Sequence, residues 1–136
     1  IVCSEDYANK NRLEIIAYIR GMAISGCSPE IMGIGPVLSS QKALKRAGIK
    51  LEDVDIIEMN EAFAAQSLAC VKELGIEMSK LNIHGGAISM GHPLGASGAR
   101  ITGKAASLLK ETGKRYALST MCVGGGQGCA TVLERA

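Results

Sequence analysis

Three short segments combine reactive side chains with glycines, and chemistry is expected there first. They are residues 60–63 (NEAF), 91–98 (GHPLGASG) and 122–128 (CVGGGQG). Between them they supply the carboxamide of Asn60, the imidazole of His92 and the thiol of Cys122. Imidazole titrates close to neutral pH, so a histidine can serve as a base or as a donor. A thiol has an ordinary pKa of about 8.5, and we expect the surroundings of Cys122 to lower it and to suit proton transfer.

Each of these residues also has a purely structural explanation, which the sequence leaves open. Asn60 could cap the helix that follows it, and His92 could pack on an apolar face with one hydrogen bond. Cys122 could be an inert buried thiol, as we expect for Cys27 and Cys70. The glycines favour reactive roles instead, because they let a backbone approach a ligand closely. Those after Cys122 expose amides that can stabilise an oxyanion, each typically by about 10²–10³ in rate.

Other kinds of glycine or metal site fit these segments poorly. Residues 124–128 lack the third glycine of a dinucleotide fingerprint, and no GxxxxGK[ST] phosphate loop is present. Residues 95–98 do not form the GxSxG elbow of serine hydrolases. Zinc bound by His84, His92 and Cys122 would have suitable ligand types but lacks the usual short spacing. We therefore expect no metal, and no cofactor-binding residue is identified.

Composition narrows the class of protein. The chain has 136 residues, enough for one domain with its own core, predicted to span 1–136. The net charge of +2 is spread over the sequence, and only one Phe and three Tyr are present, so a nucleic-acid partner is not expected. No apolar run approaches the roughly 18 residues that cross a bilayer. The five cysteines form no CxxC pair, which indicates reduced thiols inside a cell.

Hydrophobic periodicity and breaker residues predict an α/β domain with a mixed sheet packed with helices. The predicted strands cover 1–4, 14–25, 55–59, 115–122 and 128–133, and the predicted helices cover 4–11, 36–47, 61–74 and 101–112. The helix at 61–74 is expected to be buried on most sides. A strand at residues 1–4 would begin within an element, so we expect the chain to be part of a longer protein. All three reactive segments are predicted on the carboxyl side of strands, where α/β sheets bind ligands.

The three segments resemble, in order and separation, motifs of the thiolase family, and residues 32–36 (MGIGP) resemble the segment before a helix in that family. The resemblance covers nearly the whole chain. It implies the C-terminal half of a five-layer αβαβα enzyme, with the nucleophilic cysteine in an N-terminal half outside residues 1–136. This chain alone is therefore expected to be inactive. One departure is His84, which stands where many biosynthetic thiolases have a small polar residue.

The resemblance also implies a role for each motif residue. His92 would activate the nucleophilic cysteine and help to bind the thioester oxygen, and Asn60 would hold a water that completes this oxyanion site. Cys122 would take or return the α-proton of acetyl-CoA. The backbone amide of Gly124 would contribute to the oxyanion site, and Phe63 would line the acyl pocket.

For the whole protein, the resemblance implies acyl transfer between coenzyme A thioesters in fatty acid metabolism. The reaction would be a Claisen condensation of two acetyl-CoA or the cleavage of a longer 3-ketoacyl-CoA, with no cofactor beyond these substrates. Expected partners are the N-terminal thiolase domain and further copies in a dimer or tetramer. The compartment would be the cytoplasm, the mitochondrion or the peroxisome. Two alternatives stay open: a ketoacyl synthase, against which Cys122 argues, and a non-catalytic module that binds acyl-CoA or lipid or only assembles with a partner.

Overall fold

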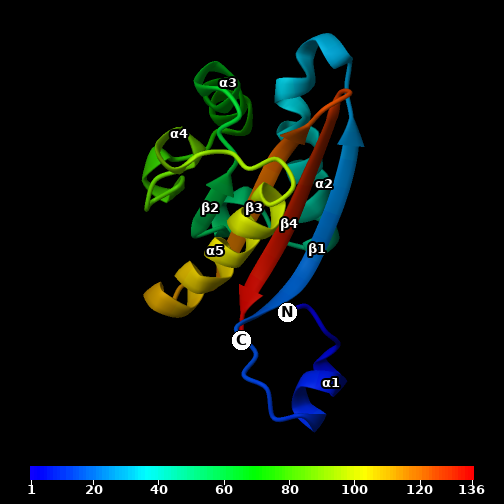
Figure 1. Ribbon diagram of the computed structural model, residues 1–136, viewed down its shortest axis with the longest axis vertical. Helices are drawn as coiled ribbons and strands as arrows, with labels where there is room; N and C mark the ends of the chain where they lie inside the picture. The colour runs from blue at the N-terminus through cyan, green and yellow to red at the C-terminus, as the bar shows by residue number, and fades with distance from the viewer.

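A four-stranded mixed sheet organises the chain in the computed structural model, which describes residues 1–136 (Figure 1). The strand order is β1-β4-β3-β2, in which β2 and β3 are parallel and the other neighbours are antiparallel. The strands are β1 (Ala17–Gly26), β2 (Ile56–Met59), β3 (Tyr116–Val123) and β4 (Gln127–Arg135). The predicted mixed sheet is thus confirmed.

Helices cover both faces of this sheet. The α-helices are α1 (Glu5–Lys10), α2 (Gly35–Ala47), α3 (Ala64–Leu74), α4 (Ala87–Met90) and α5 (Ser97–Thr112), and short 3-10 helices are η1 (Pro29–Ile34), η2 (Leu51–Asp53) and η3 (Met78–Lys80). Side chains of α2 and α3 share one apolar cluster with the sheet, and those of α5 share a second one. Both clusters contain β2 residues, because successive side chains of a strand point to opposite faces. Ile57 lies in the α2 cluster and Ile56 in the α5 cluster.

Local signals in the sequence place the helix ends well. Ser4 caps α1, its side chain accepting a hydrogen bond from the backbone of Tyr7. α2 ends at Gly48 with φ 71°, a left-handed conformation that glycine adopts without strain. The predicted face of α5 is the one that is buried, with Ile101, Ala105, Leu108 and Leu109 inside. No helix is both long and apolar enough to cross a membrane.

Residues 1–4 do not form the predicted strand. They have no regular structure, and Ile1 and Val2 are exposed. An apolar run needs a neighbouring strand to satisfy its backbone, and here the chain turns at once into α1, which lies beyond the end of the sheet where the C-terminus is found (Figure 1).

The prediction for residues 61–74 is wrong in two respects. The helix begins at Ala64, because Phe63 is extended (φ −147°, ψ 142°) and the Glu61 carboxylate accepts from the amide of Ile88, 2.8 Å away. It is also not buried on most sides: Leu68 is 60% exposed. Only one flank of α3 packs against its neighbours, so apolar spacing alone overestimated its burial.

Candidate active site

Asn60 lies at the carboxyl end of β2, where its amide extends the parallel pairing by donating to the Thr120 carbonyl at 2.9 Å. Its side chain is fully buried. Asn60 Nδ2 lies 3.4 Å from His92 Nε2, although the two residues are 32 positions apart in the sequence. Asn60 Oδ1 has no hydrogen-bond partner. An unpaired buried acceptor is costly, so it marks a place where an incoming donor would be stabilised.

His92 lies in a loop between α4 and α5, so residues 91–98 do not directly follow a strand as predicted. The loop nevertheless reaches the end of β2, because the Pro93 carbonyl accepts from the amides of Ala96 and Ser97 at 2.8 and 2.9 Å and folds the chain back. His92 Nδ1 lies 2.6 Å from the hydroxyl oxygen of Ser97, the first residue of α5. The two contacts hold the ring from both sides and direct Nε2 toward Asn60.

Ser97 and Glu61 are functional candidates that the sequence reasoning missed. Ser97 is fully buried and contacts the ring of His92. Glu61 accepts from the Asn82 side chain and from the Ile88 amide, both at 2.8 Å, and so ties the end of β2 to the segment that leads to His92. Both residues lie inside the segments already singled out, so their polar side chains were the available signal.

Cys122 is the penultimate residue of β3 and is 5% exposed. Burial raises the pKa of the Cys122 thiol, and the nearby Cys27 thiol adds to the effect. The expected lowering is therefore wrong for this chain, because loss of water around the thiolate outweighs the backbone hydrogen bond that favours it. The Cys122 thiol is held protonated at neutral pH, which suits a proton donor.

The glycine turn after Cys122 joins β3 to β4 as predicted. Gly125 and Gly126 adopt φ values of 84° and 86°. A side chain at Gly126 would also overlap the carbonyl of Cys27, whereas one at Gly124 would meet no atom within 4 Å. The backbone around Gly124 is thus open toward the space in front of the turn.

His92 and Cys122 line one cavity of about 330 Å³. Its lining comprises Met32, Ala62, Phe63, His92, Leu94, Met121, Cys122, Val123 and Gly124. Strand alternation sends Asn60 toward the α5 side and Cys122 toward the α2 side, so the cavity straddles the rim of the sheet. The structure thus brings four of the five predicted site residues to one cavity, with Asn60 behind His92. Their catalytic roles stay predictions.

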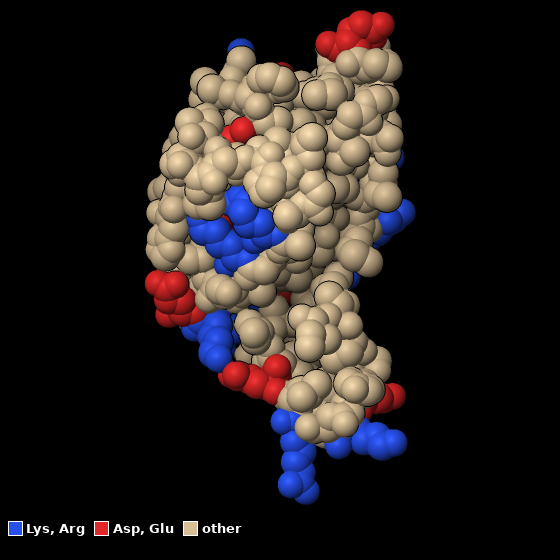
Figure 2. All heavy atoms as spheres, in the orientation of Figure 1, with Lys and Arg blue, Asp and Glu red and all other residues tan.

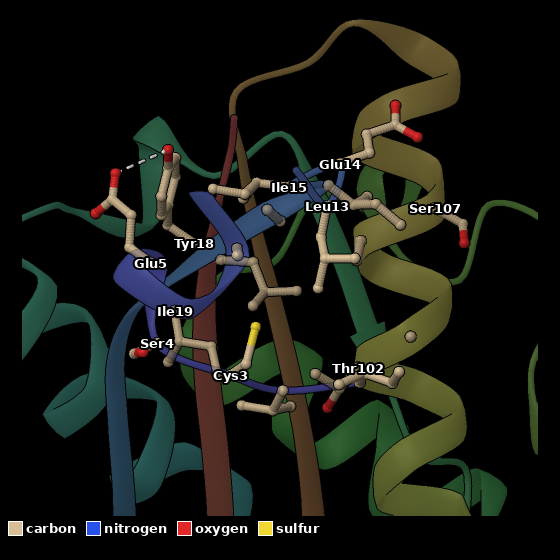
Figure 3. A pocket seen from close by; sticks show the side chains of 18 of the residues that line it. Cys3, Ser4, Glu5, Leu13, Glu14, Ile15, Tyr18, Ile19, Thr102 and Ser107 are labelled. Carbon is tan, nitrogen blue, oxygen red and sulfur yellow. Dashed lines mark hydrogen bonds between the residues drawn. The ribbon is translucent and has the colours of Figure 1, made fainter. Parts of the chain in front are cut away.

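A larger cavity of about 1010 Å³ lies elsewhere, between the N-terminal segment, α5 and β4. Figure 3 shows Cys3, Leu13, Ile15 and Ile19 around it, with Thr102 of α5 on the far wall. The lining is mostly apolar and includes none of the motif residues.

None of the residues that line the smaller cavity is Lys, Arg, Asp or Glu. In the view of Figure 2, Lys and Arg side chains form one patch in the middle of the molecule, and others project beside acidic side chains at its lower end. Lys104 and Arg100 belong to α5. No three His, Cys, Asp or Glu side chains lie together in a way that could hold a metal ion.

Comparison with known protein families matches residues 13–135 to the C-terminal domain of thiolase. Over 138 aligned residues the chain is 56% identical to a 3-ketoacyl-CoA thiolase of Vibrio parahaemolyticus and 54% identical to one of Yersinia enterocolitica. The alignments cover 99% of this chain but only 35% and 36% of those relatives. The chain therefore spans about a third of their length.

Solved structures show the same fold. The human mitochondrial 3-ketoacyl-CoA thiolase matches with a TM-score of 0.96 and 48% identity, and it has also been solved in complex with CoA. The acetyl-CoA acetyltransferase of Bacillus anthracis matches with a TM-score of 0.95 and 43% identity. In each case the match covers 98% of this chain and 34% of the other.

Proposed function

Because this chain belongs to the thiolase family, as a C-terminal domain, we propose that the protein carrying it transfers acyl groups between coenzyme A thioesters. The favoured reaction is thiolytic cleavage of a 3-ketoacyl-CoA, the activity for which the bacterial relatives are named. Condensation of two acetyl-CoA to acetoacetyl-CoA is the same chemistry in reverse. We propose that the reaction requires no cofactor beyond its thioester substrates.

The observation that carries the proposal is the contact of Asn60 with His92 at the edge of the cavity that Cys122 lines. In the proposed cleavage, His92 takes the thiol proton of a cysteine outside residues 1–136, and that cysteine attacks the keto carbon. The carbon–carbon bond breaks, its electron pair stays on the α-carbon of acetyl-CoA, and Cys122 gives that carbon its proton. The thiol of free coenzyme A gives its proton to the Cys122 thiolate and attacks the acyl-enzyme. The shortened acyl-CoA is released, and His92 returns its proton to the cysteine thiolate that leaves.

Asn60 and Gly124 would serve the oxyanions of these steps. Asn60 is fully buried and keeps an unpartnered oxygen, which suits a fixed water beside the thioester. The Gly124 amide lies on the cavity wall in an open turn. Phe63 lines the same cavity and is 62% exposed, so it would meet an acyl chain or a covering segment.

We propose that an N-terminal thiolase domain covers the apolar surface beside α5. On the sheet face that carries α5, Ile24 of β1 is aligned with Cys129 of β4 and Met121 of β3, a row that ends at the cavity. Ile24 is 70% exposed on the edge strand β1, so this row leaves an apolar side chain uncovered at the edge of the sheet. The complete protein would form a dimer or tetramer in the cytoplasm, or in a mitochondrion or peroxisome.

The test is a thiolysis assay on the full-length protein with acetoacetyl-CoA and with longer 3-ketoacyl-CoA substrates. We expect turnover by the full-length protein and none by residues 1–136. Turnover by this chain alone would contradict the expectation that the nucleophilic cysteine lies outside residues 1–136. No turnover by the full-length protein with any 3-ketoacyl-CoA, together with retained acyl-CoA binding, would favour the non-catalytic module.

The Cys122→Ser variant separates the role of Cys122 from that of the nucleophilic cysteine. It should still form the acyl-enzyme but should lose exchange of the acetyl-CoA α-proton. The matched control is Cys129→Ser, because Cys129 is partly buried on the neighbouring strand and does not line the cavity. Equal loss of acylation and exchange in Cys122→Ser would contradict the assignment.

A further inference from the structure

Glu58 is a buried charge that the proposed chemistry does not use. It lies within β2 and is 1% exposed. Neither carboxylate oxygen has a hydrogen-bond partner, and the nearest cation is Lys104 Nζ, 3.5 Å from Oε1. Burial raises the pKa of the Glu58 carboxyl, while Lys104, Arg100 and His84 act in the opposite direction. A buried carboxylate with so few partners lowers stability, so its presence calls for another reason.

The position of Glu58 connects it to the site. Side chains two residues apart on a strand share a face, so Ile56, Glu58 and Asn60 all point toward α5. On α5, Lys104 follows Ser97 by seven residues and Leu108 follows Lys104 by four, which places all three on one side of the helix.

β2 and α5 contact each other at three successive levels along their length. Ile56 and Leu108 share an apolar cluster, Glu58 faces Lys104, and Asn60 meets Ser97 through the ring of His92. The apolar contact of Ile56 with Leu108 is non-directional and tolerates a sliding of α5 along β2. The ion pair of Glu58 with Lys104, by contrast, forms at only one position of the helix. A shift of α5 by one turn, about 5.4 Å, would separate the charges and carry Ser97 away from His92.

Lys104 also contacts the segment before α4, the helix that leads to the His92 loop. Its ammonium group donates to the Gly85 carbonyl at 2.7 Å, seven residues before His92. The Lys104 side chain thus joins β2, α5 and the segment that leads through α4 to His92.

We infer that Glu58 and Lys104 are a positioning pair that fixes the register of α5 along β2 and so keeps His92 at hydrogen-bond distance from Asn60. The inference rests on the proposed function for its catalytic consequence. Its physical basis is that a buried ion pair contributes little net stability compared with apolar residues of similar size, while the setting of register is its best attested use.

The test replaces both charges at once, as Glu58→Met with Lys104→Met in the full-length protein. Removing the pair together leaves no buried charge unpaired, so the urea midpoint should equal or exceed that of the wild type, while each single variant should lower it. The kcat of the double variant should fall roughly 10²-fold, as expected for displaced catalytic groups, with little change in KM. The control is Glu14→Gln with Lys110→Gln, an exposed ion pair of 2.7 Å that joins α5 to the segment before β1, which should leave kcat unchanged.

A second readout does not depend on activity. The side-chain ¹⁵N signals of His92 in the full-length protein can be assigned as those that disappear in a His92→Asn variant. The wild type and the control pair should give one set of His92 signals, and the double variant should give several or broadened ones. If the wild-type full-length protein lacks thiolysis, the proposed function fails and this readout alone decides the inference.

Two results would overturn the positioning role. One is a folded double variant with kcat within twofold of the wild type and an unchanged His92 spectrum. The other is a double variant that fails to fold, because the pair would then be needed for stability rather than for register.

Discussion

Replacing Ser97 with alanine is the most direct test of how the site holds its histidine. The Ser97 hydroxyl lies 2.6 Å from His92 Nδ1, and Ser97 is fully buried, so water cannot easily take its place. The change removes one oxygen and with it a bond of 3.2 Å that the hydroxyl donates to the Pro93 carbonyl, but that carbonyl keeps its bonds from the amides of Ala96 and Ser97. His92 then keeps only its contact of 3.4 Å with Asn60.

The magnitude follows from the cost of an unsatisfied polar group. Leaving a buried hydrogen-bonding nitrogen without its partner typically costs about 1–3 kcal/mol. If the ring avoids this cost by turning away, the productive orientation is disfavoured by the same amount. Since 1.36 kcal/mol corresponds to tenfold in rate, kcat for thiolysis should fall roughly 5- to 150-fold. KM should change little, because Ser97 does not line the cavity.

The assay is steady-state thiolysis by the full-length protein, with urea unfolding of each variant as a check on folding. Ser107→Ala is the matched control, since Ser107 lies on the same helix and is exposed. It should leave kcat unchanged. A Ser97→Ala variant with kcat within twofold of the wild type would refute the idea that this hydroxyl holds the ring, as would an equal decrease in the Ser107 control.

Three further predictions concern the turn, the buried carboxyl and the thiol. Gly126→Ala should lower the free energy of urea unfolding by about 2–5 kcal/mol, because the new side chain combines a positive φ with a steric overlap. Gly124→Ala is the control and should change this free energy by less than about 1 kcal/mol. Equal losses in the two variants would contradict the prediction. Because burial raises the pKa of Glu58 in the folded state, the folded protein binds the proton more tightly than the unfolded chain, so this residue makes stability fall as the pH rises from about 4.5 through the folded pKa. Unfolding midpoints across that range should show a flatter profile for Glu58→Gln than for the wild type, and identical profiles would refute the assignment. In the 136-residue chain at neutral pH, iodoacetamide should modify the exposed Cys3 well before Cys122, whose rate should rise at higher pH; peptide mass spectrometry showing equal rates would contradict the raised pKa.

Local signals in the sequence were sufficient for most of the secondary structure. The spacing of apolar residues in α5 identified its buried face, and Gly48, Gly75 and Gly113 marked the helix ends at which the backbone turns left-handed. These features depend on the conformational preferences of single residues and their near neighbours, so a linear pattern records them. The three reactive segments were recognisable for the same reason, since each is contiguous.

The tertiary structure decided what those segments can do together. It showed that His92 meets Asn60 across 32 residues of sequence, that Ser97 holds the other side of the ring, and that the pKa of Cys122 is raised rather than lowered. It also left residues 1–4 without a strand partner and one side of α3 exposed. Contact, desolvation and strand pairing depend on which distant groups surround a residue, and no spacing along the chain encodes that by itself.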